Sequence, residues 1–202
     1  MNIRCITNRH LAAQDYFAQI EQIALAGPEA IIVREKDLPQ DEYKQLAAGV
    51  MEICAHHHVL CILHTYTEIA IQLGAKALHL PLPLLLSMKQ QQKSRFAILG
   101  ASIHSVEQAQ LAQNAGASYL TAGHVFETAC KPGVEPRGLD FLREVCQASA
   151  LPVYAIGGIH PKNAAACIQA GAYGICIMSD CMRHTDTQNR LKQYQIQKDR
   201  QE

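Results

Sequence analysis

The amino-acid sequence predicts one α/β domain, residues 1–202, folded as a closed (β/α)8 TIM barrel. Eight short apolar runs alternate with eight longer stretches in which polar and apolar residues recur at helical spacing. Strands that alternate with helices form right-handed crossovers and a parallel sheet. Eight such units in 202 residues match the short end of the length range of this barrel, and they favour it over an open, doubly wound sheet.

The predicted strands are rich in Val, Ile, Leu and small residues, as strands of a buried parallel sheet are. In chain order they are IRCIT, AIIVRE, VLCILH, KALHL, FAILGAS, YLTAG, PVYAIG and GICIM. The helices expected between and after them span residues 15–26, 40–57, 67–74, 84–94, 105–115, 138–149, 161–170 and 186–199.

A glycine ends the helix in every second strand–helix unit, just before the next strand begins. Glycine is typical of this position because it adopts the left-handed backbone conformation without a clash of Cβ. The four glycines are Gly27, Gly74, Gly116 and Gly171. A helix-ending glycine that recurs at four equivalent positions indicates a repeating architecture and supports the closed barrel.

The composition excludes several classes of function. Lys plus Arg and Asp plus Glu number 18 each, so the formal net charge is zero. A neutral chain with 5% aromatic residues and no Trp lacks the basic surface and the stacking platform of nucleic-acid-binding proteins. No apolar run approaches the ~20 residues that cross a membrane, and no N-terminal stretch resembles a secretion signal. We therefore expect a cytoplasmic protein that binds neither nucleic acid nor membrane.

Phosphate binding is expected after the seventh and eighth strands. Active sites of such barrels lie at the carboxyl ends of the strands, and the last two loops often hold a phosphate. Gly157 and Gly158 follow the seventh strand, and Met178 and Ser179 follow the eighth. Two glycines let the backbone approach an anion closely. The alternative is a tight turn that simply needs small residues.

Two groups of cationic side chains are candidates for binding an acidic substrate. The longest loop, residues 124–138, contains Thr128 and Lys131, with Arg137 as a further candidate. Arg34 and Lys36 end the second strand, and strand alternation sends both to the same side. The alternatives are a solvated loop in the first case and a structural Arg34–Glu35 pair in the second.

Three stretches of the chain resemble the thiamine-phosphate synthase family. They are Ile32-Val33-Arg34-Glu35-Lys36, Gly123-His124-Val125-Phe126-Glu127-Thr128-Ala129-Cys130-Lys131 and Ala155-Ile156-Gly157-Gly158-Ile159. The resemblance extends over residues 3–182, and the second stretch is most similar to the thiazole tautomerase (TenI-like) branch. The resemblance implies a barrel that binds a small-molecule thiazole phosphate.

The chain departs from the synthase branch, which joins the thiazole phosphate to a pyrimidine diphosphate with Mg²⁺. That branch has a motif similar to Pro-Thr-x-Thr-Lys after the sixth strand, where this chain has Cys130 in place of one hydroxyl-bearing residue. It carries Asn-Asp after the third strand and a Gln with acidic neighbours after the fourth. This chain has His64-Thr65 and Leu80-Pro81-Leu82-Pro83-Leu84 there. Because Mg²⁺ requires oxygen ligands, these departures weaken the synthase interpretation.

The resemblance therefore favours a metal-independent thiazole tautomerase, an isomerase of a carboxythiazole phosphate, over a transferase. His124 matches the catalytic histidine of that branch and lies at a strand end. A histidine titrates near pH 6.5, so it can accept and donate a proton. Its alternative role is a rim histidine bonded to the backbone. His104 is expected to bind substrate, or else to cap the next helix near Ser105. Neither a cofactor nor a metal is implied.

Two other functions stay open. One is a thiamine-phosphate synthase with rearranged metal ligands, for which Glu35, Glu127 and Asp180 are the nearby acids. The other is a regulator that binds thiazole phosphate without catalysis. We also expect a homodimer, because an apolar face around residues 82–86 would need cover.

Overall fold

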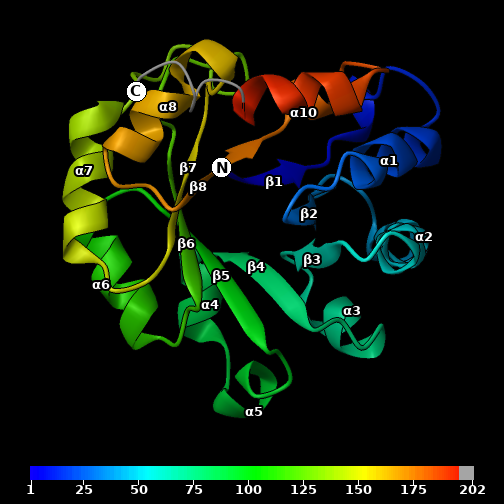
Figure 1. Ribbon diagram of the computed structural model, residues 1–202. Coiled ribbons are helices and arrows are strands. Elements are labelled where there is room, and N and C mark those ends of the chain that lie inside the picture. Colours follow the sequence, from blue (N-terminus) through cyan, green and yellow to red (C-terminus); the bar gives the residue numbers. More distant parts are fainter. Residues whose placement is uncertain (196–202) are drawn as a thin grey trace.

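Eight parallel strands form a closed barrel, in which each strand pairs with its neighbours in the sequence and β8 pairs with β1 (Figure 1). The computed structural model describes residues 1–195. The strands are β1 (Asn2–Ile6), β2 (Ala30–Val33), β3 (Leu60–His64), β4 (Ala77–Pro81), β5 (Ile98–Ile103), β6 (Tyr119–Gly123), β7 (Val153–Ile156) and β8 (Gly174–Ile177). The predicted (β/α)8 TIM barrel is confirmed.

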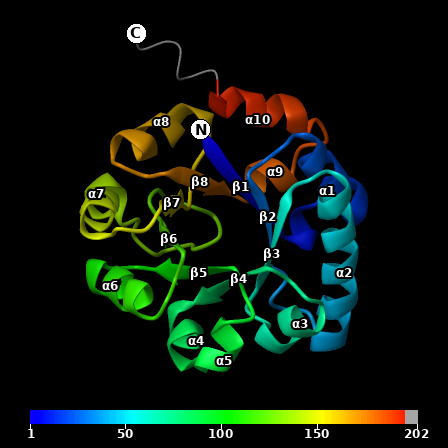
Figure 2. The same ribbon diagram turned by 60° about the horizontal axis from the view of Figure 1, so that its bottom comes forward.

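Helices surround the barrel, and Figure 2 shows them as a ring in chain order. They are α1 (Tyr16–Leu25), α2 (Gln40–His56), α3 (Thr67–Gln72), α4 (Leu82–Ser87), α5 (Gln90–Lys93), α6 (Val106–Asn114), α7 (Gly138–Ala148), α8 (Pro161–Gln169) and α10 (Thr187–Gln195). Two short helical segments, η1 (Arg9–Leu11) and α9 (Ser179–Met182), follow β1 and β8. The end of the predicted helix 186–199 lies outside the described residues.

The predicted helix 84–94 is wrong, because two short helices, α4 and α5, occupy this region. Met88 and Lys89 adopt extended backbone conformations, with ψ of 134° and 148°, and this separates the two helices. Helix α4 begins at Leu82, earlier than expected, since Pro83 stands in its first turn, where a missing N–H breaks no helical hydrogen bond.

The four helix-ending glycines are confirmed by their backbone angles. Their φ values are 65° at Gly27, 65° at Gly74, 91° at Gly116 and 101° at Gly171. Positive φ at these positions is what the sequence pattern predicts.

The main apolar core lies between the strands and the surrounding helices, while the barrel interior is partly polar. The guanidinium of Arg4 on β1 lies 3.9 Å from the ring centre of Tyr119 on β6, although these strands are not neighbours. This contact must therefore cross the interior. No helix within residues 1–195 is long and apolar enough to span a membrane.

Candidate functional site

Arg34, Lys36 and His64 lie together where β2 and β3 end. His64 is buried, and its backbone N–H donates to the hydroxyl of Tyr43 at 3.0 Å. Burial, followed by the positive charges of Arg34 and Lys36, lowers the pKa of His64 to about 3. His64 is therefore neutral at pH 7, and the cationic character of this rim comes from the two strand-end side chains.

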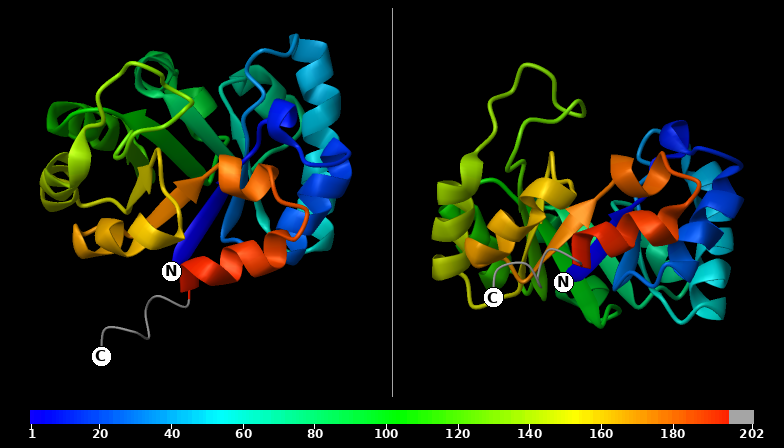
Figure 3. Two further views of the ribbon diagram at one scale, coloured as in Figure 1. Left: turned by 90° about the horizontal axis from the view of Figure 1, so that it is seen from above. Right: turned by 45° about the horizontal axis from the view of Figure 1, so that its top comes forward.

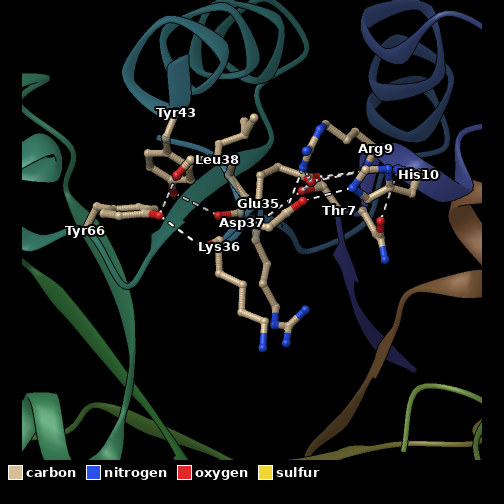
Figure 4. A network of polar contacts seen from close by, with 12 residues as sticks. Thr7, Arg9, His10, Glu35, Lys36, Asp37, Leu38, Tyr43 and Tyr66 are labelled. Carbon is tan, nitrogen blue, oxygen red and sulfur yellow. Dashed lines mark hydrogen bonds and ion pairs between the residues drawn. The ribbon is translucent and has the colours of Figure 1, made fainter. Parts of the chain in front are cut away.

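Glu35 stabilises the rim between β1 and β2 (Figure 4). Thr7 donates its hydroxyl to the Glu35 carboxylate at 2.7 Å, and the Arg9 backbone N–H donates at 3.0 Å. The Arg9 guanidinium lies 3.4 Å away, and the Glu35 side chain is only 1% exposed. Glu35 is thus bound to β1 and η1, which argues against the alternative of a structural Arg34–Glu35 pair.

Replacing Glu35 by Gln should lower the free energy of unfolding by about 1–2 kcal/mol. The amide keeps the shape but weakens the charge-assisted bonds from Thr7 and Arg9. Urea denaturation at pH 7 measures the change, with Glu127→Gln as a control because Glu127 is exposed on the loop after β6. Equal stability of the two variants would show that the Glu35 charge does not hold this rim.

His79 lies deeper in the barrel, below these strand ends. Its ring stacks on His64, with centroids 5.4 Å apart, and it is 2% exposed. Its Nδ1 lies 2.9 Å from the Tyr119 hydroxyl and its Nε2 lies 2.8 Å from that of Ser102. Burial above all lowers the pKa of His79 well below its usual value. Sequence reasoning missed this residue as a functional candidate.

His104 and His124 lie on the opposite side of the barrel, directly after β5 and β6. His104 donates its Nδ1–H to the Gly123 carbonyl at 2.7 Å. Ser105 itself caps α6 by accepting the Gln108 N–H, so His104 is not the cap.

His124 is 5% exposed and donates its Nε2–H to the Val134 carbonyl at 3.1 Å. Its buried Nδ1 has no hydrogen-bond partner.

The loop after β6 projects beyond the barrel (Figure 3, right), and it carries two cations, Lys131 and Arg137, whose charges act on His104. Burial first, and then the charges of Lys131 and Arg137, lower the pKa of His104. The Thr128 hydroxyl accepts the Cys130 N–H at 3.3 Å, which fixes a turn next to Lys131. The roles of Thr128 and Lys131 in binding substrate remain predictions.

Gly157 and Gly158 allow the loop after β7 to pack against the loop after β6. Their φ values are 100° and 66°. A Cβ at Gly157 would lie 2.2 Å from the His124 Cβ, and one at Gly158 would lie 2.2 Å from the Glu127 carbonyl oxygen. Ile156 pairs with Cys176 near the ends of β7 and β8. Residues 178 and 179 therefore come directly after the strand next to β7. Phosphate binding by Gly157, Gly158, Met178 and Ser179 stays a prediction.

The residues present do not fit the Mg²⁺ site of the synthase branch. After β3 the chain has His64-Thr65, and after β4 it has Leu82, which is buried in the core, and Leu84, which lines a cavity of about 370 Å³ beside α3. Within residues 1–195, no group of three or more His, Cys, Asp or Glu side chains could hold a metal ion.

Two of the three acids considered as replacement ligands, Glu35 and Asp180, have other partners. Glu35 binds Thr7 and Arg9, as described above. Asp180 accepts two hydrogen bonds of 2.9 Å from the Arg190 guanidinium, which links α9 to α10. Neither carboxylate is therefore free to serve as a metal ligand.

The thiamine monophosphate synthase family model matches residues 3–181. A thiamine-phosphate synthase of Coprothermobacter proteolyticus is 35% identical over 196 residues, which cover 95% of this chain and 92% of the relative. A thiamine-phosphate synthase of Roseiflexus sp. is 35% identical over 179 residues, covering 86% of this chain and 75% of the relative. Among solved structures, thiamine phosphate pyrophosphorylase from Pyrococcus furiosus has a TM-score of 0.84 and 26% identity, and the match covers 96% of this chain and 94% of that one.

These findings correct the predicted reaction class. The predicted isomerase is wrong, because relatives that are 35% identical over most of the chain are thiamine-phosphate synthases, which are transferases. The Nε2–H of His124 is bonded to the Val134 carbonyl, as in the alternative of a rim histidine, and the catalytic role of His124 stays a prediction. The chain belongs to the thiamine monophosphate synthase family.

Proposed function

We propose that this protein is a transferase that joins a thiazole phosphate to a pyrimidine, releasing pyrophosphate from a pyrimidine diphosphate. The names of the relatives support this reaction. The observation that carries the proposal is the presence of cations after β2 and after β6, two strands on opposite sides of the barrel. Arg34 and Lys36 follow β2, while Lys131 and Arg137 lie on the loop after β6. Two phosphorylated substrates require this kind of positive charge.

These cationic side chains would neutralise the diphosphate directly. The Arg34 guanidinium can form two parallel hydrogen bonds to phosphate oxygens. The side chain of Lys131 is exposed and can reach a second phosphate group. The glycine pair after β7 would hold the thiazole phosphate through backbone N–H groups. A homodimer remains part of this proposal, since Leu84 and Leu86 on α4 are 40% and 47% exposed.

A second function is favoured by the missing acidic ligands. A protein that binds thiazole phosphate without catalysis would need the cations and glycines but not the carboxylates. The two functions differ in turnover, so one experiment separates them.

Product formation from thiazole phosphate and pyrimidine diphosphate is the direct test, followed by mass spectrometry with either Mg²⁺ or EDTA present. Formation of thiamine phosphate supports the transferase. Calorimetric binding of thiazole phosphate without any product under either condition supports the binding protein. Absence of both binding and product would overturn both functions.

Replacing Lys131 by Ala should weaken binding of the pyrimidine diphosphate by about tenfold, or ~1.4 kcal/mol. The ammonium group loses its contact with the anion, and the salt dependence of binding should fall with it. Titration calorimetry at two salt concentrations measures both effects. Lys192→Ala is the matched control, because this exposed lysine lies on α10, away from the strand ends. Equal affinities of the two variants would remove Lys131 from the site.

A further inference from the structure

A line of polar side chains crosses the barrel interior from β1 to β5. The Tyr119 hydroxyl lies 2.9 Å from His79 Nδ1, and His79 Nε2 lies 2.8 Å from the Ser102 hydroxyl. Thr121 donates to the same Ser102 oxygen at 3.3 Å. His79, Tyr119 and Thr121 are buried, whereas Ser102 is partly exposed near the carboxyl end of β5. Ser102 is therefore the member of this line that can reach a bound substrate.

Arg4 lies at the other end of this line, between two tyrosine rings. Its guanidinium carbon is 3.9 Å from the ring centre of Tyr119 and 3.8 Å from that of Tyr154. Its Nη2 forms an ion pair with Glu29 at 3.0 Å, while the buried Nε and Nη1 have no hydrogen-bond partner. A poorly solvated cation over a ring withdraws electron density, so Arg4 makes the Tyr119 hydroxyl a stronger donor.

His79 can occupy either of two neutral tautomers, and they differ in what Ser102 can do. If Tyr119 donates to Nδ1, then Nε2–H donates to Ser102, whose own proton is free to point at a ligand. If Nδ1–H donates to Tyr119 instead, then Nε2 is an acceptor. Ser102 at 2.8 Å is then its donor, being nearer than the Thr121 hydroxyl at 3.4 Å, and has no proton for a ligand. Burial raises the pKa of Tyr119, so its hydroxyl keeps the proton that it donates. Arg4 over the ring favours the first arrangement.

We propose that Tyr119, supported by Arg4, is a positioning residue that fixes His79 as the Nε2–H tautomer and so presents the Ser102 hydroxyl as a donor to the substrate. The substrate that receives this hydrogen bond rests on the proposed function. The tautomer does not, because it follows from contacts within the protein.

Gly100 leaves room for the contact between the His79 and Tyr119 side chains. It pairs with both His79 on β4 and Tyr119 on β6. A Cβ at this position would lie 2.2 Å from Tyr119 Cζ and 2.4 Å from His79 Nδ1. Any other residue at position 100 would therefore separate the two rings that share the hydrogen bond.

Nitrogen-15 NMR of histidine-labelled protein reads the tautomer without any substrate. In the wild-type protein we expect His79 Nε2 to carry the proton and Nδ1 to show the shift of a hydrogen-bond acceptor. In Tyr119→Phe the acceptor shift at Nδ1 should disappear, whereas Tyr154→Phe should leave it unchanged. Tyr154 is the matched control, since it also flanks Arg4 but its hydroxyl binds Glu29 at 2.7 Å. A proton on Nδ1 in the wild-type protein would overturn the proposal.

Kinetics then test whether the tautomer matters to the substrate. Tyr119→Phe should lower kcat/KM about five- to tenfold, the effect of one neutral hydrogen bond, and Tyr154→Phe less than twofold. Ser102→Ala should lose as much, and the double variant Tyr119→Phe/Ser102→Ala should be no worse than Ser102→Ala alone. Additive losses would show that Tyr119 does not act through Ser102. If the wild-type protein forms no product, the proposed function fails, while the NMR result still decides the tautomer.

Discussion

Gly158→Ala is expected to destabilise the protein by about 3 kcal/mol and to weaken thiazole-phosphate binding by more than tenfold. The added Cβ would lie 2.2 Å from the Glu127 carbonyl oxygen and 2.8 Å from the Phe126 Cβ, at a φ of +66°. The first contact is with backbone, which cannot swing aside as a flexible side chain can. The loop after β6 must therefore move, and both proposed anion-binding loops would lose their mutual packing.

Gly133→Ala separates the two causes of this effect. Gly133 lies in the loop after β6 with a similar φ of +73°, but a Cβ there would have no neighbour within 4 Å. Gly133→Ala should lower the free energy of unfolding by about 1 kcal/mol, from backbone strain alone. Thermal unfolding and calorimetric titration with thiazole phosphate measure both variants. Should Gly158→Ala behave like Gly133→Ala, the glycine is not needed for the contact between the loops.

The barrel could be predicted because its strands and most of its helices carry their own local signals. Apolar runs of strand length, and glycines such as Gly74 and Gly171 at helix ends, act over a few residues and require no knowledge of distant partners. The one helix that was placed wrongly, residues 84–94, is interrupted at Met88 and Lys89, and neither residue type carries a signal for an extended backbone.

The strand-end candidates could be placed for a related reason, whereas their partners could not. Strand order brings Arg34 and Lys36 to the rim, but the sequence does not indicate that Glu35 would bind Thr7 and Arg9. The glycine pair after β7 is also understood only in three dimensions. Its contacts with the loop after β6 depend on how two loops fold over each other.

The interior line of Arg4, His79 and Tyr119 was missed, although one signal was available. Each residue interrupts or ends an otherwise apolar strand, and a charged or polar group in such a run needs a buried partner. Which partner it has depends on contacts across the barrel. Arg4 and Tyr119 are on β1 and β6, strands that do not pair, so neighbour rules alone could not join them.

Stability should fall by about 2 kcal/mol between pH 6.5 and pH 4.5 on account of His64, and further on account of His79. Burial lowers the pKa of His64 to about 3 and that of His79 well below its usual value. In the unfolded chain both titrate near pH 6.5. Below that pH the unfolded state binds protons that the folded state does not, so stability decreases as pH falls, by up to about 1.4 kcal/mol per pH unit for His64.

Urea denaturation at pH 6.5, 5.5 and 4.5 measures this slope, and variants assign it. His64→Asn should remove the His64 contribution of about 2 kcal/mol, because that suppressed protonation site is gone. His56→Asn is the control, since the His56 side chain is exposed in the folded protein and loses little hydration on folding. Carboxylates also titrate near the lower end of this range, but their contribution is common to all three proteins. The difference between slopes therefore reports the histidines, and identical slopes for His64→Asn and His56→Asn would mean that His64 is protonated in the folded barrel.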